Sequence, residues 1–419
     1  MKLSQLFVKT QKQDPSGEES VNAKLLIRWG FVYKEMAGVY TFLPMGLRVL
    51  NKIENIIRKH INKVGNEVLM TALSPEQNWI TTGRLETIDV LMKTSGANEI
   101  SRNKSTNEYV LNCTHEDMIT PIVKSYVNSY KDLPVHAYQI QNKFRNEARA
   151  KSGILRGREF RMKDLYSFHA TEEDFEQYYE KVKAVYVEIF EELGIGEDTY
   201  VTLASGGDFT KRYSHEFQTV CAVGEDIIYA DKASKMAINQ EVWNDETKAL
   251  FPDANWEEVT ASEIGNIFPL ETKFTEATDF TFMDAENNKK HPIMWSYGIW
   301  PSRVMWVIVE KLHDEKGIIR PKNVAPFEYV IIAIGDKGLE EAQKLYANLI
   351  DKWVDVCLDD RDLGPWAKFA DAELIGYPTQ IIIGNKTLEQ DMSCELVDRA
   401  SGEKKLVRIE EFSTHIQSI

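Results

Sequence analysis

A short, strongly basic stretch near the middle of the chain is a candidate for chemistry on a phosphorylated substrate. Between Lys143 and Lys163 there are eight basic residues and two acidic ones, Glu147 and Glu159. The basic residues are Lys143, Arg145, Arg149, Lys151, Arg156, Arg158, Arg161 and Lys163. Guanidinium groups match phosphate oxygens through paired hydrogen bonds. We therefore expect a phosphate-handling hairpin here, and composition alone leaves open a solvated strand pair with a basic loop.

Two short strands, at 139–144 and 158–163, are predicted to carry this stretch on either side of a loop that contains glycine and arginine. A helix is predicted at 49–64, where apolar residues recur on one helical stripe and lead into a short β-like run at 67–73. A second helix is predicted at 171–192, because Thr171 is a suitable cap and three acidic residues follow it at the positive end of the helix dipole.

The pattern changes near residues 321–326, and helices then alternate with apolar strands. Strands are expected at 329–334, 354–358 and 379–383, helices at 337–352 and 367–375, and a hairpin at 394–398 and 405–409. This alternation predicts a small parallel or mixed α/β sheet. We therefore expect two domains, at 1–322 and 323–419.

The composition of the 419 residues is that of an ordinary globular protein, with 43% apolar and 27% charged residues. The four cysteines are far apart and form no CxxC pair, so neither a zinc ribbon nor a disulfide framework is indicated. No apolar run approaches the roughly 20 residues that span a bilayer, and a soluble cytoplasmic protein is expected. The net charge of −15 argues against nucleic-acid binding through bulk positive charge.

The residues FRNE at 144–147, followed by a loop and REF at 158–160, resemble motif 2 of the class II aminoacyl-tRNA synthetases. Further segments at 38–48, 114–116, 138–141, 163–169, 214–217 and 313–317 are, together with it, similar to the bacterial-type prolyl-tRNA synthetases. The resemblance runs from Leu3 to the C-terminal hairpin, with a variable patch at about 241–269.

The resemblance implies an α+β class II catalytic domain built on an antiparallel sheet, followed by an α/β anticodon-binding domain. Motif 1 would lie at about 49–73, motif 2 at about 138–164 and motif 3 at about 293–312. The implied activity is ATP-dependent ligation of L-proline to tRNA(Pro) through a prolyl-adenylate, with Mg²⁺ accompanying ATP, in a homodimer. A class II ligase for another amino acid is the enzyme alternative, and a non-catalytic RNA- or protein-binding paralogue is the alternative of another kind.

The same resemblance assigns four residues to ATP, two of them catalytic. Arg145 would hold both the α-phosphate and the carboxylate side of the bound proline, and Arg303 would bind the γ-phosphate. Glu147 would contact the adenine end and Phe160 would stack on the purine. Positioning and charge neutralisation are what such a phosphoryl-group reaction asks of a protein.

Proline recognition would fall to Thr114 and Glu116, because a carboxylate suits the positively charged secondary amine of proline. His169, Ser214 and His215 fit loops around the same amino-acid pocket. Without the resemblance, Thr114-His-Glu116 would be interpreted as a surface turn and the histidines as core or surface residues.

This sequence departs from its relatives in two features, the length of one segment and a residue at the expected dimer interface. The segment at about 241–269 is too short for the editing domain of larger relatives. We therefore expect no clearance of mischarged alanyl-tRNA in cis, and a separate factor could edit in trans. Motif 1 ends at Val68-Leu-Met-Thr71 where relatives have proline, which leaves the local interface contact open.

Five of the nine tryptophans stand where similar sequences have glycine, whereas Trp79 stands where they have tryptophan. The five are Trp295, Trp300, Trp306, Trp353 and Trp366. Overpacking at such sites destabilises a fold, and the indole of Trp300, three residues before Arg303, is expected to enter the ATP site. A degenerate paralogue or a co-adapted pocket would each explain part of the set. A gene that uses UGA for glycine would explain, with one rule, the tryptophans in both domains.

Overall fold

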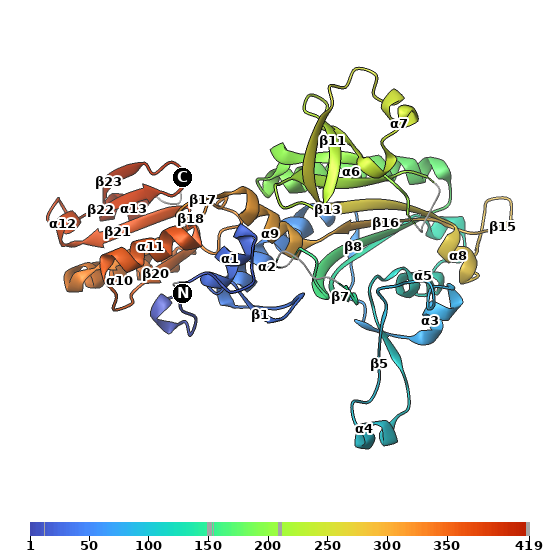
Figure 1. Cartoon of the computed structure of the whole chain (residues 1–419), viewed down its shortest axis with the longest axis horizontal. Coiled ribbons are helices and arrows are strands. Elements are labelled where there is room, and N and C mark those ends of the chain that lie inside the picture. Colours follow the sequence, from blue (N-terminus) through green and yellow to red (C-terminus); the bar gives the residue numbers. More distant parts are fainter. Residues whose placement is uncertain (12, 149–152, 154, 208–211, 416–419) are drawn as a thin grey trace. The chain divides into compact units, whose positions relative to one another are not determined.

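The computed structural model describes the chain except for residues 12, 149–152, 154, 208–211 and 416–419. The described residues form two compact units (Figure 1). The central unit comprises residues 35–40 and 53–307, and the terminal unit comprises residues 1–34, 41–52 and 308–419. In the part of the chain that the structure describes, no helix is both long and apolar enough to cross a membrane.

The central unit is built on a nine-stranded sheet whose middle strands are long and antiparallel. In sheet order the strands are β10 (Ser214–Val220), β9 (Thr199–Ala204), β12 (Met236–Asn239), β11 (Asp226–Asp231), β13 (Glu257–Glu271), β16 (Ile293–Ile299), β8 (Glu159–His169), β7 (Val135–Phe144) and β3 (Asn66–Glu67). Strand β10 also pairs with β13. The predicted antiparallel catalytic sheet is confirmed.

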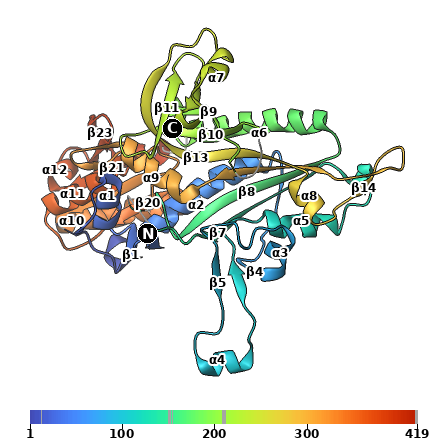
Figure 2. The ribbon, with the colours of Figure 1, turned by 45° about the vertical axis from the view of Figure 1, so that its right-hand side comes forward.

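Side chains of β8 alternate between the two faces of this sheet. Leu165 and Ser167 point to the face covered by helix α6 (Glu172–Glu192), here the α6 face. Asp164, Tyr166 and Phe168 point to the other face, which packs against α5 (Glu116–Lys124). Figure 2 shows the two helices on opposite sides of the sheet. We call this second face the α5 face.

Helix α6 begins as the sequence predicted, because the side chain of Thr171 accepts a hydrogen bond from the backbone N–H of Asp174 at 3.3 Å. The predicted strand at 67–73 is wrong over most of its length. The backbone N–H of Met70 bonds to the side chain of Gln139 at 3.0 Å, which replaces a strand ladder at this point.

The remaining elements of the central unit are short. They are β4 (Leu73–Pro75), β5 (Met92–Thr94) and β6 (Tyr109–Leu111) in a three-stranded sheet, α3 (Glu76–Thr81), α4 (Glu99–Lys104), α7 (Asp245–Ala249), α8 (Lys273–Ala277), and the pair β14 (Phe282–Met283) and β15 (Lys289–Lys290). Residues 241–269 form part of a 3-10 turn, α7 and most of β13, so this stretch belongs to the sheet and carries no inserted domain.

Four elements have residues in both units. They are β1 (Val32–Met36), β2 (Val39–Phe42), α2 (Pro44–Ile61) and α9 (Pro301–Lys311). Helix α2 confirms the predicted amphipathic helix, but it starts five residues earlier, at Pro44. Proline suits the first helical position because its missing N–H is not needed there.

The terminal unit contains a mixed five-stranded sheet. Its strands are, in order, β20 (Val356–Asp359), β19 (Tyr329–Ile334), β21 (Thr379–Gly384), β22 (Ser393–Asp398) and β23 (Lys404–Arg408). Its other elements are α1 (Val21–Arg28), β17 (His313–Asp314), β18 (Gly317–Ile318), α10 (Gly335–Asp351), α11 (Pro365–Ile375), α12 (Asn385–Leu388) and α13 (Ile409–His415). The predicted α/β pattern is confirmed, with strand β19 parallel to both neighbours and β22 antiparallel to both of its own.

Candidate active site

Strands β7 and β8 form the predicted hairpin, and its register decides which basic side chains face a ligand. Lys143 pairs with Phe160 across the two strands. Lys143 is fully buried, and its ammonium lies 2.8 Å from the carboxylate of Asp164. Lys163 is equally buried on the α6 face and donates to the carbonyl of Tyr297 at 3.1 Å. These two lysines are interior structural groups and do not contribute to a phosphate surface.

The arginines of the hairpin also differ in their partners. Arg161 pairs with Glu54 at 2.8 Å and Arg156 with Glu225 at 3.1 Å. Arg149 and Lys151 lie outside the described residues. The guanidinium of Arg145 differs in lying over the ring of Phe160, 5.2 Å from its centre. Fewer basic side chains than predicted are therefore available to bind phosphate, and Arg145 is one of them.

The four residues predicted to bind ATP line one cavity in the central unit. Arg145, Glu147, Phe160 and Arg303 share it with Trp300, and its volume is about 10 Å³. Such a volume holds about one water molecule. We call this site the Arg145–Arg303 cavity. The predicted residues are brought together, but with these side chains the cavity is closed.

Trp300 is what fills the cavity. It is buried against Phe160 and Met162, and the guanidinium of Arg303 lies 4.5 Å from the centre of its ring. Arg303 donates to the carbonyl of Leu155 at 3.1 Å. Burial lowers the pKa of Arg303. The predicted entry of the Trp300 indole among these residues is thus observed.

Two half-buried glutamates, Glu216 and Glu263, lie close together, and Glu263 lies beside Arg303. The carboxylate of Glu263 is 3.4 Å from the Arg303 guanidinium. Burial, with the neighbouring charge of Glu263, raises the pKa of Glu216 to about 8. In the described parts of the chain, no group of three or more His, Cys, Asp or Glu side chains is placed to hold a metal ion. One or two carboxylates together with substrate phosphates is nevertheless the usual setting of Mg²⁺.

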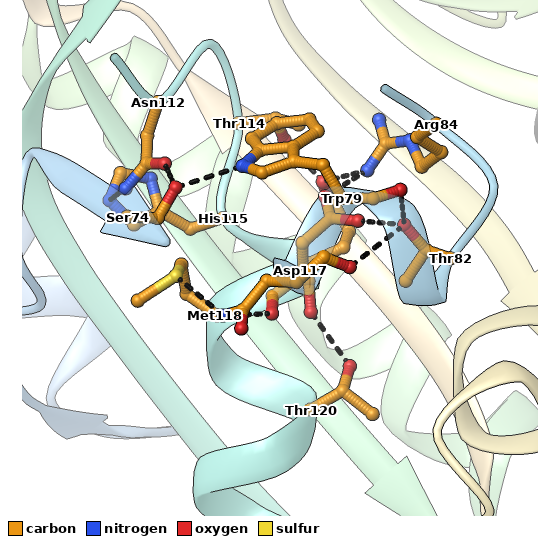
Figure 3. Close-up of polar contacts among 12 residues, drawn as sticks. Ser74, Trp79, Thr82, Arg84, Asn112, Thr114, His115, Asp117, Met118 and Thr120 are labelled. Carbon is orange, nitrogen blue, oxygen red and sulfur yellow. Dashed lines mark hydrogen bonds and ion pairs between the residues drawn. The ribbon is translucent and has the colours of Figure 1, made fainter. Parts of the chain in front are cut away.

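A second polar group lies on the α5 face, where helix α5 begins (Figure 3). The hydroxyl of Thr114 donates to the carboxylate of Glu116. Arg84 lies 3.3 Å from that carboxylate and 2.5 Å from the carboxylate of Asp117. We call these four residues the Arg84 cluster. All four are held by one another, and the two acids lie in the first turn of α5, where the helix dipole favours negative charge.

His115 connects the Arg84 cluster to the buried lysine. Its Nε2 lies 2.9 Å from the carbonyl of Thr71, and its Nδ1 faces the ammonium of Lys143. Since Lys143 can only donate, Nδ1 accepts and Nε2 carries the proton. Burial, reinforced by the charge of Lys143, lowers the pKa of His115 to about 4. A neutral His115 therefore joins the Lys143–Asp164 pair to the loop that carries Thr114.

The other three residues predicted for proline binding lie in strands, which corrects the loops expected for them. His169 ends β8, while Ser214 and His215 begin β10. Ser214 is buried and donates to the carbonyl of Ser205 at 2.5 Å.

The two histidines lie on the α6 face. His169 lies 2.6 Å from the carboxylate of Asp174, and His215 bonds to the hydroxyl of Tyr179, and both partners belong to α6. Burial lowers the pKa of His215 to about 4. The structure therefore does not bring these histidines together with Thr114 and Glu116.

Sequence reasoning missed Arg84, Asp117 and the Lys143–Asp164 pair as parts of this site. A charged residue inside a strand of buried residues indicates that its charge is paired in the interior, and Lys143 and Asp164 are both residues of this kind. Arg84 gives no such signal, because the turn after α3 carries it to Glu116 through tertiary structure alone.

Comparisons with known proteins agree with this architecture. Residues 98–312 match the tRNA synthetase class II core domain (G, H, P, S and T), and residues 328–419 match the anticodon binding domain. The chain is 37% identical over 437 residues to a proline--tRNA ligase of Rickettsia akari (strain Hartford), with 100% of both chains covered. It is 38% identical to that of Rickettsia rickettsii (strain Sheila Smith), over 96% of this chain and 97% of the relative.

Two solved structures share the fold. One is the prolyl-tRNA synthetase from Cryptosporidium parvum complexed with L-proline and AMP, with a TM-score of 0.75 and 17% identity over 98% of this chain and 76% of that one. The other is the same organism's enzyme complexed with halofuginone and AMPPNP, with a TM-score of 0.76. At this level of identity the likeness concerns the fold.

Proposed function

The chain belongs to the proline--tRNA ligases, a family of class II aminoacyl-tRNA synthetases, and we propose which of its residues carry out the reaction. The Arg84 cluster takes proline and the Arg145–Arg303 cavity takes ATP. The observation that carries this assignment is that the two sites share the α5 face. Lys143 contacts His115 on one side and pairs with Phe160 across the hairpin on the other.

The first step joins proline to the nucleotide. A carboxylate oxygen of proline attacks the α-phosphorus of ATP, the bond from that phosphorus to the bridging oxygen breaks, and pyrophosphate leaves. Arg145 neutralises charge on the α-phosphate and Arg303 on the γ-phosphate, while Phe160 stacks on the purine and Glu147 holds its polar edge. In the second step a ribose hydroxyl of tRNA(Pro) attacks the prolyl carbonyl and AMP leaves. Positioning and charge neutralisation supply the catalysis.

Glu116 and Thr114 recognise the amino end of proline. The carboxylate of Glu116 lies at the start of α5, 3.3 Å from Arg84, and a carboxylate accepts a charge-assisted hydrogen bond from a secondary ammonium. His169 and His215 act at most through α6 and β10, since both lie on the opposite face.

Mg²⁺ enters with ATP in this proposal. Glu216 and Glu263 offer hard oxygen donors, and the raised pKa of each carboxyl reflects burial beside like charge. A divalent cation held by these carboxylates would relieve that repulsion and would offset negative charge on the pyrophosphate.

A homodimer is proposed through the edge of the large sheet. Strand β3 forms that edge, and it is followed by Val68 and Leu69, which are 39% and 76% exposed. Exposed apolar side chains after an edge strand favour burial against a second copy.

The two domains divide the work on tRNA. We assign activation and transfer to residues 1–322 and anticodon recognition to residues 323–419, in the cytoplasm where charged tRNA is used. Residues 241–269 leave no room for an editing domain, so mischarged alanyl-tRNA is left to a separate factor in trans.

Aminoacylation of tRNA(Pro) with radiolabelled proline, by the protein purified from its natural source, tests the proposal. Label is expected in tRNA only when ATP and Mg²⁺ are present. Transfer of a different amino acid would make the chain another class II ligase. A protein that binds tRNA(Pro) but transfers no amino acid would be the non-catalytic paralogue.

A further inference from the structure

Five tryptophans lie in the two synthetase domains without a role in the proposed reaction. We propose that glycine is the working residue at positions 295, 300, 306, 353 and 366, and that the missing side chain at 300 opens the nucleotide site. The second statement rests on the proposed function. The first stands on backbone geometry and packing, which are independent of it.

Residue 353 has the backbone of a helix-ending glycine. Helix α10 ends at Asp351, and Trp353 follows with a φ of 61°. Its N–H bonds to the carbonyl of Ile350 at 2.9 Å, and the N–H of Val354 bonds to the carbonyl of Leu349 at 3.0 Å. This pair of bonds is the Schellman motif, whose left-handed residue is usually glycine.

The same chain shows what ordinarily fills that position. Helices α1, α3 and α6 end in the same pair of hydrogen bonds, with glycine in the left-handed place each time, at Gly30, Gly83 and Gly194. Helix α8 ends in it with Asp279, a residue type that tolerates this conformation. A bulky aromatic residue is an outlier in this conformation. Trp353 is also 95% exposed, so no packing of its ring repays the strain.

Positions 295, 300 and 306 give a second signature. Each indole is buried, and none of the three indole N–H groups has a hydrogen-bond partner in the part of the chain that the structure describes. A buried indole ordinarily finds a partner. Trp79 shows this in the same unit: it is fully buried, and its N–H donates to the hydroxyl of Ser74 at 2.8 Å (Figure 3).

Residue 300 also occupies a position where glycine is favoured. The N–H of Val304 bonds to its carbonyl at 2.9 Å, and Pro301 is the first residue of α9, so residue 300 caps the helix. Glycine is accepted at this position and large apolar residues are disfavoured. Removing the indole also clears the space between Phe160 and Arg303, where the purine and phosphates are proposed to bind.

Two tryptophans, Trp366 and Trp29, are not decided by these structural signatures. Trp366, in the first turn of α11, is 87% exposed, so its surroundings accept either residue. Trp29 is buried and its indole N–H has no partner among the described residues, which is the signature that positions 295 and 306 also show. Residue 366 is included because similar sequences have glycine there. Trp29 is left as tryptophan because it is not one of those five positions, and packing alone does not separate it from them.

A single rule accounts for the five positions: their codons are UGA, and UGA is decoded as glycine. Mass spectrometry of peptides from the natural protein tests this directly. Peptides that contain residues 295, 300, 306, 353 and 366 are expected to carry glycine, and the peptide that contains Trp79 is expected to carry tryptophan. Tryptophan in the first set, or UGG at those codons, overturns the inference whatever the enzyme does.

ATP titration calorimetry on four proteins tests the role of position 300. The chain as printed and its Trp353→Gly variant are expected to show no ATP binding, whereas Trp300→Gly and the five-glycine protein bind ATP. Trp353→Gly serves as the matched control, and it is expected to raise the melting temperature without opening the site. Equal ATP binding by the printed chain and Trp300→Gly overturns the gating role. Glycine in the natural peptides together with ATP binding but no transfer of proline leaves this inference standing and contradicts the proposed function.

Discussion

The Arg84 cluster and the Arg145–Arg303 cavity lie on the same face of one sheet and differ in how well their groups fit together. In the cluster, Thr114 bonds to Glu116 and two carboxylates share one guanidinium. In the cavity, an indole occupies the space between Phe160 and Arg303, and its N–H has no partner among the described residues.

This difference shows that the printed residues satisfy one another's hydrogen bonds in the Arg84 cluster but not in the Arg145–Arg303 cavity. Preorganised polar groups are what a binding site for a small charged molecule requires, and the cluster meets that requirement without a ligand. A cavity of about 10 Å³ cannot admit a nucleotide. If the proposed assignment holds, the amino-acid side of the site needs no change to the printed residues, whereas the nucleotide side needs a small residue at 300.

The link between the two sites carries the largest expected effect. Lys143→Met leaves Asp164 as a buried carboxylate without its cation, which costs about 3–5 kcal/mol of stability. Urea unfolding measures the loss. Lys143→Met combined with Asp164→Asn is the control, and it is expected to recover part of the stability because no charge stays buried. Losses that simply add would contradict a coupled pair.

On the nucleotide side, Arg145→Ala in the five-glycine protein is expected to lower the rate of ATP–pyrophosphate exchange by about 10²–10³-fold, as for loss of one charge-stabilising group. Arg212→Ala is the matched control, because Arg212 pairs with Glu172 at the surface of α6. An equal loss in both variants would assign the effect to general charge.

On the amino-acid side, Glu116→Gln is expected to raise the KM for proline by about 10–100-fold, because a charge-assisted hydrogen bond contributes about 1.5–3 kcal/mol. The KM for ATP should stay unchanged. Glu99→Gln, at an exposed position of α4, is the control. If the ATP constant rose and the proline constant did not, Glu116 would belong to the nucleotide.

The last expected effect is a pH dependence of stability at Glu216, beside Glu263. The pKa of Glu216 is raised from 4.5 to about 8, so between these values the folded protein keeps a proton that the unfolded chain has released. The free energy of unfolding therefore falls as the pH rises through this range. Glu216→Gln should flatten the slope in urea unfolding across these pH values. An unchanged slope would mean that Glu216 is ionised throughout.

Much of the fold could be predicted from the sequence, because local signals fix it. Helix α6 begins where Thr171 caps it, and the strands and helices that were predicted for 329–409 agree with the structure to within two residues at each end. The strand expected at 67–73 failed because the side chain of Gln139, distant in the sequence, takes the backbone N–H of Met70.

The site was predictable where a motif names a residue and not where packing places it. Arg145, Glu147, Phe160 and Arg303 meet in one cavity as expected. Spacing could not show that Lys143 is buried against Asp164, or that His169 faces α6. Which face of a strand a side chain occupies depends on the register of the sheet.

The most direct test of the central claim is ATP–pyrophosphate exchange by the five-glycine protein with each of the twenty amino acids in turn. The two sites on the α5 face predict exchange that depends on proline, and that Glu116→Gln weakens through the KM for proline. Exchange driven by a different amino acid, or a protein that binds ATP and exchanges with none, would contradict the account.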